Sequence, residues 1–335
     1  MSAPTITRDE FLQRRRKGIG GSDMAAILGL SPYKTPFAIW QDKTGRAIDH
    51  TTPEQEERMG WGNILEDVVA RHYADKCGRR VQRINQQMQH KRWPVIIGNV
   101  DRVCVQQGTQ ARWDAKTGRV LGADAVLEVK TASAFAARDI DNWGEPGTDA
   151  VPQHYWMQVQ HYLGITGLPV ADLAVLFGGQ QFRTYTIHAD TALHDDMFAQ
   201  AADWWERHVV ADVPPDPTTE EEARLAWKTA RAGATLVADY DTAQAVYRLQ
   251  EVKRRIDELK TEETELRDRI CPVFQDAEIL IWQGQKLATW KANKPSAKTD
   301  WKAVAAALGA SPDLIATHTT TTEGARVLRL VSNKE

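Results

Sequence analysis

Two short apolar segments of the sequence carry charged residues that a buried strand does not normally hold. Residues 94–103, PVIIGNVDRV, contain Asp101, and residues 125–132, AVLEVKTA, contain Glu128 and Lys130. Both segments have the length and composition of short strands. These three residues are therefore the first candidates for chemistry.

Side chains alternate along a strand, so Glu128 and Lys130 are expected to share one face, and Asp101 to share a face with Asn99 and Ile97. If the two strands pair on that face, the two carboxylates can meet at one metal ion. Hard oxygen ligands of this kind suit magnesium or manganese. The lysine could orient or deprotonate a water, or stabilise charge on a phosphate. The alternative is an ion-pair network on a solvated sheet face.

Two further segments point to the same chemistry. In a predicted long helix, Glu66 precedes Val69, Ala70 and Tyr73 at helical spacing and so lies on a partly apolar, inward-facing stripe. A carboxylate there is costly unless it is paired or binds a cation. The stretch RRRKGIGGSD, residues 14–23, has glycines that let the backbone approach a ligand and a helix start that could hold a phosphate. A Gly-rich turn capped by Ser22, or a solvated basic run, is the simpler alternative for that stretch.

The elements that position these residues read as an α/β layer structure. Helices are expected at residues 23–30, 52–78, 151–167 and 193–210, with Ser22 or Asp23 as the first N-cap and two strands at residues 172–187. The stretch ADVPPDPTTEEEA, residues 211–223, interrupts every periodic pattern. We therefore expect two domains, residues 1–212 and 213–335.

The second region shows no chemical cluster. Its apolar residues follow a heptad pattern that Glu263 interrupts, namely Leu249, Val252, Ile256, Leu259, Leu266 and Ile270. This pattern predicts a helical hairpin or a short coiled coil. A β-hairpin around Gln283 and Gly284, a helix at residues 299–309 and a last strand at residues 325–331 should follow.

Composition limits the function classes. The chain has 335 residues, of which 42% are hydrophobic and 26% charged, and no apolar run approaches the length of a membrane span. The first residues lack the apolar centre of a signal peptide, so we expect a cytoplasmic protein without membrane contact. The three cysteines lie far apart with no CxxC pair, so the sequence indicates neither a disulfide framework nor a zinc or iron–sulfur site. A net charge of -3 argues against indiscriminate binding of nucleic acid, although a local basic cleft can still attract phosphate.

Five motifs in this order resemble the lambda-exonuclease group, also called YqaJ-type viral recombinases, of the PD-(D/E)xK nuclease class. They are RRRKGIGGSDMAAILGLSPYKTPFAIWQDKTG, MGWGNILEDVVARHY, IIGNVDRV, LEVKTA and WMQVQHYLGITG, over residues 14–167. Val100 stands where the family signature has proline. The resemblance implies a restriction-endonuclease-like core, a mixed central sheet flanked by helices.

The resemblance also implies roles for individual residues. Asp101, Glu128 and the main-chain carbonyl of Val129 would bind metal, Lys130 would be the catalytic lysine, and Glu66 would serve a second metal position. Arg15 and Ser22 would hold the 5'-phosphate end or the scissile phosphate, and Gln158 would lie near the site.

The function expected from this set is a metal-dependent 5'-to-3' exonuclease that degrades one strand of linear double-stranded DNA for phage-type recombination. The resemblance implies Mg²⁺, with Mn²⁺ as a substitute and two ions in the site. It also implies a homotrimer around the DNA and a single-strand annealing protein as partner. The alternatives are a restriction-type or structure-specific endonuclease, and a non-catalytic DNA-binding protein on the same fold.

Overall fold

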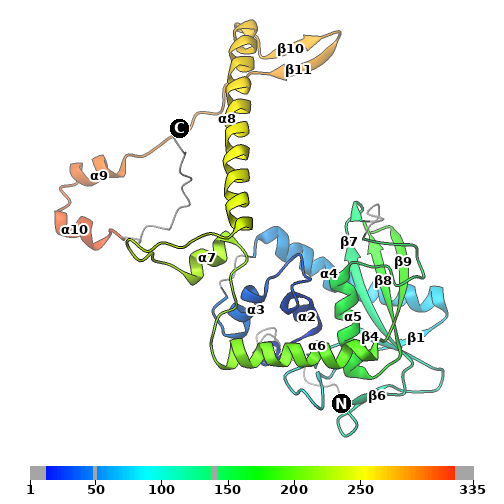
Figure 1. Ribbon diagram of the computed structural model, residues 1–335. Coiled ribbons are helices and arrows are strands. Elements are labelled where there is room, and N and C mark those ends of the chain that lie inside the picture. Colours follow the sequence, from blue (N-terminus) through cyan, green and yellow to red (C-terminus); the bar gives the residue numbers. More distant parts are fainter. Residues whose placement is uncertain (1–12, 48–50, 137–141, 321–335) are drawn as a thin grey trace. The chain divides into compact units, whose positions relative to one another are not determined.

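A computed structural model describes residues 13–47, 51–136 and 142–320 of the chain (Figure 1). The chain divides into two units, Met1–Ala226 and Trp227–Glu335, which are described separately below. The expected boundary after residue 212 precedes this division. The intervening α7, Glu220–Ala226, remains with the first unit because the buried Glu222 accepts a hydrogen bond from Thr35.

The first unit is built on a five-stranded mixed sheet in the order β1-β4-β7-β8-β9. Its strands are β1 Arg80–Gln82, β4 Arg102–Val105, β7 Ala125–Ala132, β8 Val170–Phe177 and β9 Gln181–His188. Strand β7 is antiparallel to β4 and parallel to β8, and α5, Gln153–Thr166, lies between β7 and β8 in the chain. Two small antiparallel pairs stand outside the sheet: β2 Met88–Gln89 with β3 Ile97–Gly98, and β5 Arg112–Asp114 with β6 Arg119–Leu121.

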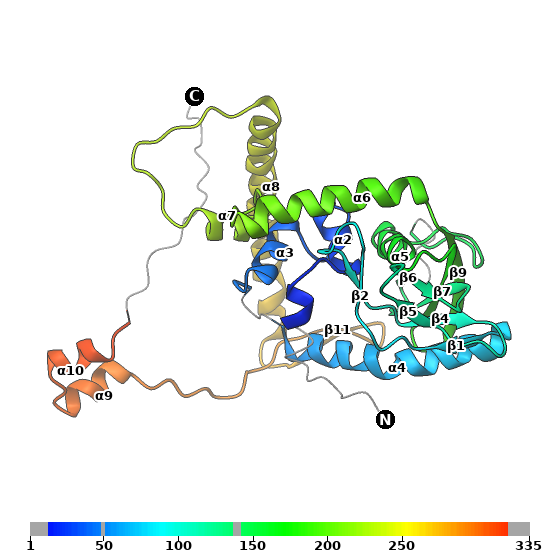
Figure 2. The ribbon, with the colours of Figure 1, turned by 90° about the horizontal axis from the view of Figure 1, so that it is seen from below.

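Helices cover both faces of this sheet (Figure 2). They are α2 Gly21–Ile27, α3 Pro36–Lys43, α4 Pro53–Cys77, α5, and α6 Thr191–Trp204, which continues as the π-helical segment η2 Trp205–Val210. Val126 of β7 packs in the core with α5, whereas Leu127 and Val129 pack with Val69 and Ala70 of α4. The alternation expected along β7 is confirmed, and so is the mixed sheet flanked by helices.

Local signals set the ends of the two long helices in the first unit. Thr52 caps α4 by accepting from the Gln55 amide, and Gly78 ends it with φ 61°. Gly167 ends α5 with φ 69°. A left-handed residue at this position is the usual glycine stop, so both predicted ends are confirmed.

The segment around Asp101 differs from the prediction. Strand β3 ends at Gly98 and β4 begins at Arg102, so Asp101 lies in the connection and not within a strand. Its carboxylate is nevertheless fixed, because Oδ2 accepts the Val129 amide at 2.9 Å. The short connection lets Asp101 turn toward β7 at the point where β4 and β7 begin to pair.

The glycine-rich stretch serves packing, and its cap differs from the prediction. A Cβ at Gly21 would come within 2.9 Å of the Tyr162 ring, and one at Gly18 within 2.6 Å of the Val95 carbonyl oxygen. The N-cap of α2 is Gly20, and Asp23 accepts the Gly20 amide at 3.0 Å from inside the helix. Asp23 therefore already takes up one of the amides expected to bind phosphate.

The second unit contains one long helix where a helical hairpin was a candidate. Helix α8, Tyr240–Phe274, runs for 35 residues without a turn, because its only proline, Pro272, lies near its end and it contains no glycine. The predicted β-hairpin follows as β10 Ile279–Trp282 and β11 Gln285–Thr289. Two short helices, α9 Trp301–Ala307 and α10 Pro312–Thr317, complete this part. The predicted strand at residues 325–331 lies outside the described residues.

No helix in the described ranges is long and apolar enough to cross a membrane.

Candidate active site

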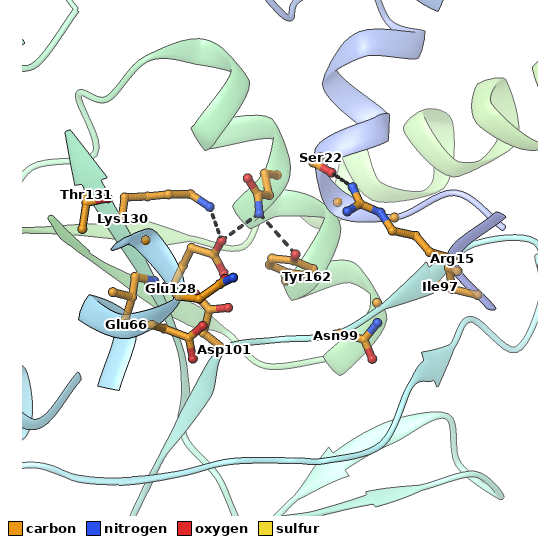
Figure 3. Close-up of a pocket in the computed structure, with 17 residues that line it drawn as sticks. Arg15, Ser22, Glu66, Ile97, Asn99, Asp101, Glu128, Lys130, Thr131 and Tyr162 are labelled. Atoms are coloured by element: carbon orange, nitrogen blue, oxygen red, sulfur yellow. Dashed lines mark hydrogen bonds and ion pairs between the residues drawn. The ribbon is translucent and has the colours of Figure 1, made fainter. Parts of the chain in front are cut away.

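A cavity of about 480 Å³ opens in the first unit at the residues that the sequence singled out. All seven predicted site side chains line it, together with the backbone of Val129: Arg15, Ser22, Glu66, Asp101, Glu128, Lys130 and Gln158. Figure 3 shows the labelled residues of this set converging from β7, α4, α2, the segment before α2 and the connection between β3 and β4. Residues up to 143 positions apart in the chain (15 to 158) thus share one site.

Glu128 is the centre of the hydrogen-bond network in this cavity. Its Oε1 accepts from Lys130 Nζ at 2.7 Å and from Gln158 Nε2 at 2.7 Å (Figure 3). Its Oε2 is buried and has no hydrogen-bond partner among the described residues. A buried carboxylate oxygen without a partner is costly, so this oxygen is suited to a cation.

The electrostatics of the carboxylates point the same way. Burial, and then the charge of Asp101, raise the pKa of Glu128 to about 8. Burial also raises the pKa of Asp101, although Lys130 opposes it. Burial would lower the pKa of Lys130, but Glu128 and Asp101 outweigh it and raise that pKa. A divalent ion between the two carboxylates would favour their ionised forms and oppose these upward pKa shifts.

The two carboxylates fit an oxygen-ligated ion only in company with other donors. The described residues hold no group of three or more His, Cys, Asp or Glu side chains that could bind one metal. Asp101 and Glu128 would therefore need the Val129 carbonyl and water molecules to complete the coordination shell of the ion. Mg²⁺ commonly keeps several waters in its shell.

Glu66 reaches the cavity from α4 but is paired elsewhere. Its Oε1 accepts from Arg102 at 2.7 Å and from Arg83 at 3.1 Å. Arg102 is buried, and it also donates to Asp67 and to the main-chain oxygen of Asp101. The arginine thus links the helix carboxylate to the backbone of the candidate metal ligand.

Arg15 and Ser22 meet on the opposite side of the cavity. Arg15 NH2 donates to Ser22 Oγ at 2.5 Å (Figure 3). Beneath them Lys43 Nζ donates to Asp23 Oδ2 at 2.6 Å and to the Arg15 carbonyl at 3.0 Å. Burial would raise the pKa of Asp23, but Lys43 and Arg15 outweigh it and keep that pKa below its usual value. The buried pair holds the backbone of Arg15 in place.

Sequence reasoning missed several residues of this site. Tyr162 lines the cavity and accepts from Gln158 at 3.2 Å, and it follows Gln158 by one helical turn, so spacing could have found it. Arg102 stands inside a quoted motif, and a second charge next to Asp101 in an otherwise apolar stretch was the signal for a buried partner. Nothing in the sequence links Lys43 to Asp23.

Comparison with known proteins identifies the family. A family model described as the YqaJ-like viral recombinase domain matches residues 10–169. The chain is 34% identical over 293 residues to the uncharacterised protein YqaJ of Bacillus subtilis (strain 168), covering 85% of this chain and 84% of that protein. The chain belongs to the YqaJ family.

Other relatives of this YqaJ-family chain are more distant. The uncharacterised protein R354 of Acanthamoeba polyphaga mimivirus is 24% identical over 163 residues, which cover 49% of this chain and 27% of that protein. Among solved structures, an alkaline exonuclease (LHK-Exo) from Laribacter hongkongensis matches with a TM-score of 0.45 and 16% identity, over 66% of this chain and all of that one. A phage-related exonuclease from Haemophilus somnus 129PT matches with a TM-score of 0.38 and 12% identity, over 61% of this chain and all of that one.

Proposed function

We propose that this protein is a metal-dependent 5'-to-3' exonuclease that degrades one strand of linear double-stranded DNA and leaves 3' single-stranded tails. The observation that carries the proposal is Glu128. One of its oxygens is held by Lys130 and Gln158, while the other is buried in the cavity that Asp101 lines and has no partner within the described part of the chain. Membership of a family described as viral recombinases supports the choice of DNA as substrate.

Asp101, Glu128 and the Val129 carbonyl would hold Mg²⁺, for which Mn²⁺ would substitute. The ion would stabilise charge on the phosphate and lower the pKa of a bound water. Lys130 is held beside Glu128, where its ammonium can orient the attacking water and offset the charge of the phosphate. Gln158 holds the Glu128 carboxylate in one orientation.

Glu66 would serve a second ion. Its oxygen is shared by Arg102 and Arg83, so a second ion has to compete with these two cations for the same carboxylate. We therefore propose that the first ion binds more tightly than the second. Titration with Mn²⁺ should show two classes of site, and Glu66→Gln should remove the weaker one.

Arg15 and Ser22 would hold the 5'-phosphate end of the degraded strand. A guanidinium and a hydroxyl that already meet over one wall of the cavity present several donors to an anion. The homotrimer and the annealing-protein partner rest on the family resemblance, and sedimentation of the full chain with and without DNA tests the trimer.

The experiment that tests the reaction compares linear duplex with covalently closed circular duplex, each with Mg²⁺ and with EDTA. An exonuclease of this type should release nucleotides from a 5' label before a 3' label and should leave the circle intact. Cleavage of the circle would instead identify an endonuclease, and binding without cleavage of either would identify a non-catalytic protein.

The same assay tests the phosphate contact. Arg15→Ala should slow degradation of 5'-phosphorylated ends by about ten- to a hundredfold, because a hydrogen bond to a charged group contributes about 1.5–3 kcal/mol. Ends with a 5'-hydroxyl should be affected much less. Arg16→Ala is the matched control, since Arg16 is an exposed neighbour that does not line the cavity. Equal losses on both end types would contradict a phosphate contact at Arg15.

A further inference from the structure

Helix α8 carries a narrow apolar stripe that is open to solvent. The stripe consists of Leu249, Val252, Ile256, Leu259, Leu266 and Ile270, with Glu263 in the same row, and is called the α8 stripe below. The five residues from Val252 onward have 36–60% of their surface exposed. Alternating steps of three and four residues make one straight seam, the pattern of a coiled-coil partner and not of a helix facing a broad core.

The positions that border the α8 stripe are almost all basic. The heptad places Leu249, Ile256, Glu263 and Ile270 at position a and Val252, Leu259 and Leu266 at position d, so the bordering positions are e and g. These seven are Arg248, Lys253, Arg255, Lys260, Glu262, Arg267 and Arg269, of which six are cations. The remaining acids occupy the b, c and f positions, which face away from a partner helix: Glu251, Asp257, Glu258, Glu265 and Asp268. The helix is therefore polarised, basic beside its apolar seam and mostly acidic on its outer face.

Two of the bordering cations have weak contacts within the helix. Lys260 lies 3.6 Å from Asp257, and Arg267 lies 3.8 Å from Glu263. Exposed pairs of this length contribute little to stability. They leave the cations able to exchange these contacts for carboxylates of a partner.

This charge pattern disfavours a second copy of the same helix. In paired helices the bordering positions of one helix face those of the other and decide which partners associate. Two copies of α8 would place cation against cation in either orientation. A parallel pair would also place Glu263 against Glu263, where like charges destabilise the complex.

The pattern also differs from that of a helix lying on a membrane or on DNA. Membrane-surface helices carry a broad apolar face, whereas the α8 stripe is one residue wide at each step and contains Glu263. A nucleic-acid contact would use the cations but not the row of Leu, Ile and Val side chains.

We propose that the α8 stripe docks an amphipathic helix of a separate protein whose own apolar heptads are bordered by Asp and Glu, with a basic or amide side chain opposite Glu263. Apolar contact supplies affinity, and the complementary borders select the partner and its orientation. This interface is independent of the nuclease site, so the failure of one proposal leaves the other standing.

The test uses two synthetic helical peptides of four heptads with identical Leu and Ile residues. One peptide has Glu at the bordering positions and a single Lys placed to face Glu263, and the other has Lys at the bordering positions. Fluorescence anisotropy with the full chain should show micromolar or tighter binding of the acidic peptide, weakened by added salt, and at least tenfold weaker binding of the basic peptide. Equal affinity for both, or no binding of the acidic peptide at 100 µM, would overturn the proposal.

Adjacent arginines of α8 provide a matched pair of variants. Arg255 borders the α8 stripe, whereas Arg254 lies on the outer face with Glu251 and Glu258. Arg255→Glu should weaken binding of the acidic peptide about three- to tenfold, and Arg254→Glu should leave it within twofold. Leu259→Asp should abolish binding. Circular dichroism and thermal unfolding of each variant show that the chain remains folded. Equal effects of the two arginine variants would contradict the assigned seam.

The alternative partners of the α8 stripe, namely a second copy of this chain, DNA and a membrane, would give distinct results. If Leu259→Asp lowers the sedimentation coefficient of the protein alone, the α8 stripe pairs copies of this chain and the proposal fails. The proposal also fails if the full chain binds duplex DNA, or vesicles containing phosphatidylserine, and Leu259→Asp weakens that binding as much as it weakens binding of the acidic peptide. The proposal is supported if Leu259→Asp leaves the sedimentation coefficient, DNA binding and vesicle binding unchanged and abolishes only binding of the acidic peptide.

Discussion

The two units use the same charged residue types in opposite ways. In the first unit Lys43 and Asp23 form an ion pair whose side chains are 0% and 1% exposed, directly beneath Arg15. On α8 Arg254 forms pairs with Glu251 and Glu258, and all three side chains are more than 40% exposed. Charge inside the first unit is fixed by mutual contacts, whereas charge on α8 is screened and available.

Apolar residues show the same contrast. Val126, Leu127 and Val129 of β7 are buried between two layers of helices, whereas the α8 stripe faces solvent. A buried, fixed environment can shift the pKa of Glu128 and orient it. An exposed environment can only present a surface. The contrast suits the first unit to the proposed chemistry and the second unit to the proposed recognition of a partner.

The buried ion pair should show the largest effect on stability. Lys43→Met should destabilise the first unit by about 3–5 kcal/mol, because it leaves the charge of Asp23 buried without its partner. Urea titration followed by hydrogen–deuterium exchange of β7 and β8 peptides measures the loss. Lys17→Met, at an exposed position, is the control. The double variant Asp23→Asn/Lys43→Met should recover part of the loss, and a loss below 1 kcal/mol in Lys43→Met would contradict the contrast.

Acid should destabilise the first unit through His161. Burial lowers the pKa of His161 to about 4. One ring nitrogen, Nε2, contacts the Ile97 carbonyl at 2.8 Å, and the other, Nδ1, is buried with no partner in residues 13–47, 51–136 and 142–320. The folded-state pKa lies below the unfolded value near 6.5, so the stabilisation is present above pH 6.5 and is lost as the pH falls toward 4. It amounts to about 3 kcal/mol in full.

The measurement compares urea unfolding of the wild type and His161→Gln between pH 7 and pH 4, with exchange of β7 and β8 peptides as the probe. The variant should lose less stability in acid than the wild type, and α8 peptides should show no difference between the two proteins. Identical pH dependence in both proteins would show that His161 does not carry the effect.

The exposed pairs on α8 should show the smallest effect. Arg254→Ala should change the stability of the full chain by less than about 1 kcal/mol, because exposed pairs pay side-chain entropy and are screened by water. The helix signal at 222 nm during thermal unfolding measures it, at low and high salt. A loss as large as that of Lys43→Met would mean that α8 is packed against a partner surface and is not exposed.

Much of the first unit could be predicted because its signals are local. Gly78 and Gly167 mark the ends of α4 and α5, and alternation along residues 125–132 gives the faces of β7. The site residues could be proposed together because each is a polar residue in an otherwise apolar pattern, or because the family resemblance names it.

The remainder depends on contacts that the sequence does not encode locally. The connection that contains Asp101 has the composition of a strand. Its path is instead set by the hydrogen bond from the Val129 amide to Asp101 and by the pairing of β4 with β7, which begins at Arg102. Lys43 meets Asp23 only when α2 and α3 pack together. The heptads of α8 show an apolar seam but not whether the partner is the same chain, so they allowed a hairpin where the structure has one helix.

The central claim is that Glu128 binds the metal ion while Lys130 acts on the reaction without binding it. The direct test measures Mn²⁺ binding by calorimetry and single-turnover cleavage of 5'-labelled linear duplex in the wild type, Glu128→Gln and Lys130→Met. Glu128→Gln should lose both binding and cleavage. Lys130→Met should still bind Mn²⁺, and should cleave about 10²- to 10⁴-fold more slowly, the range typical for loss of a proton-transfer group. Cleavage by Glu128→Gln at a rate near that of the wild type would contradict the account.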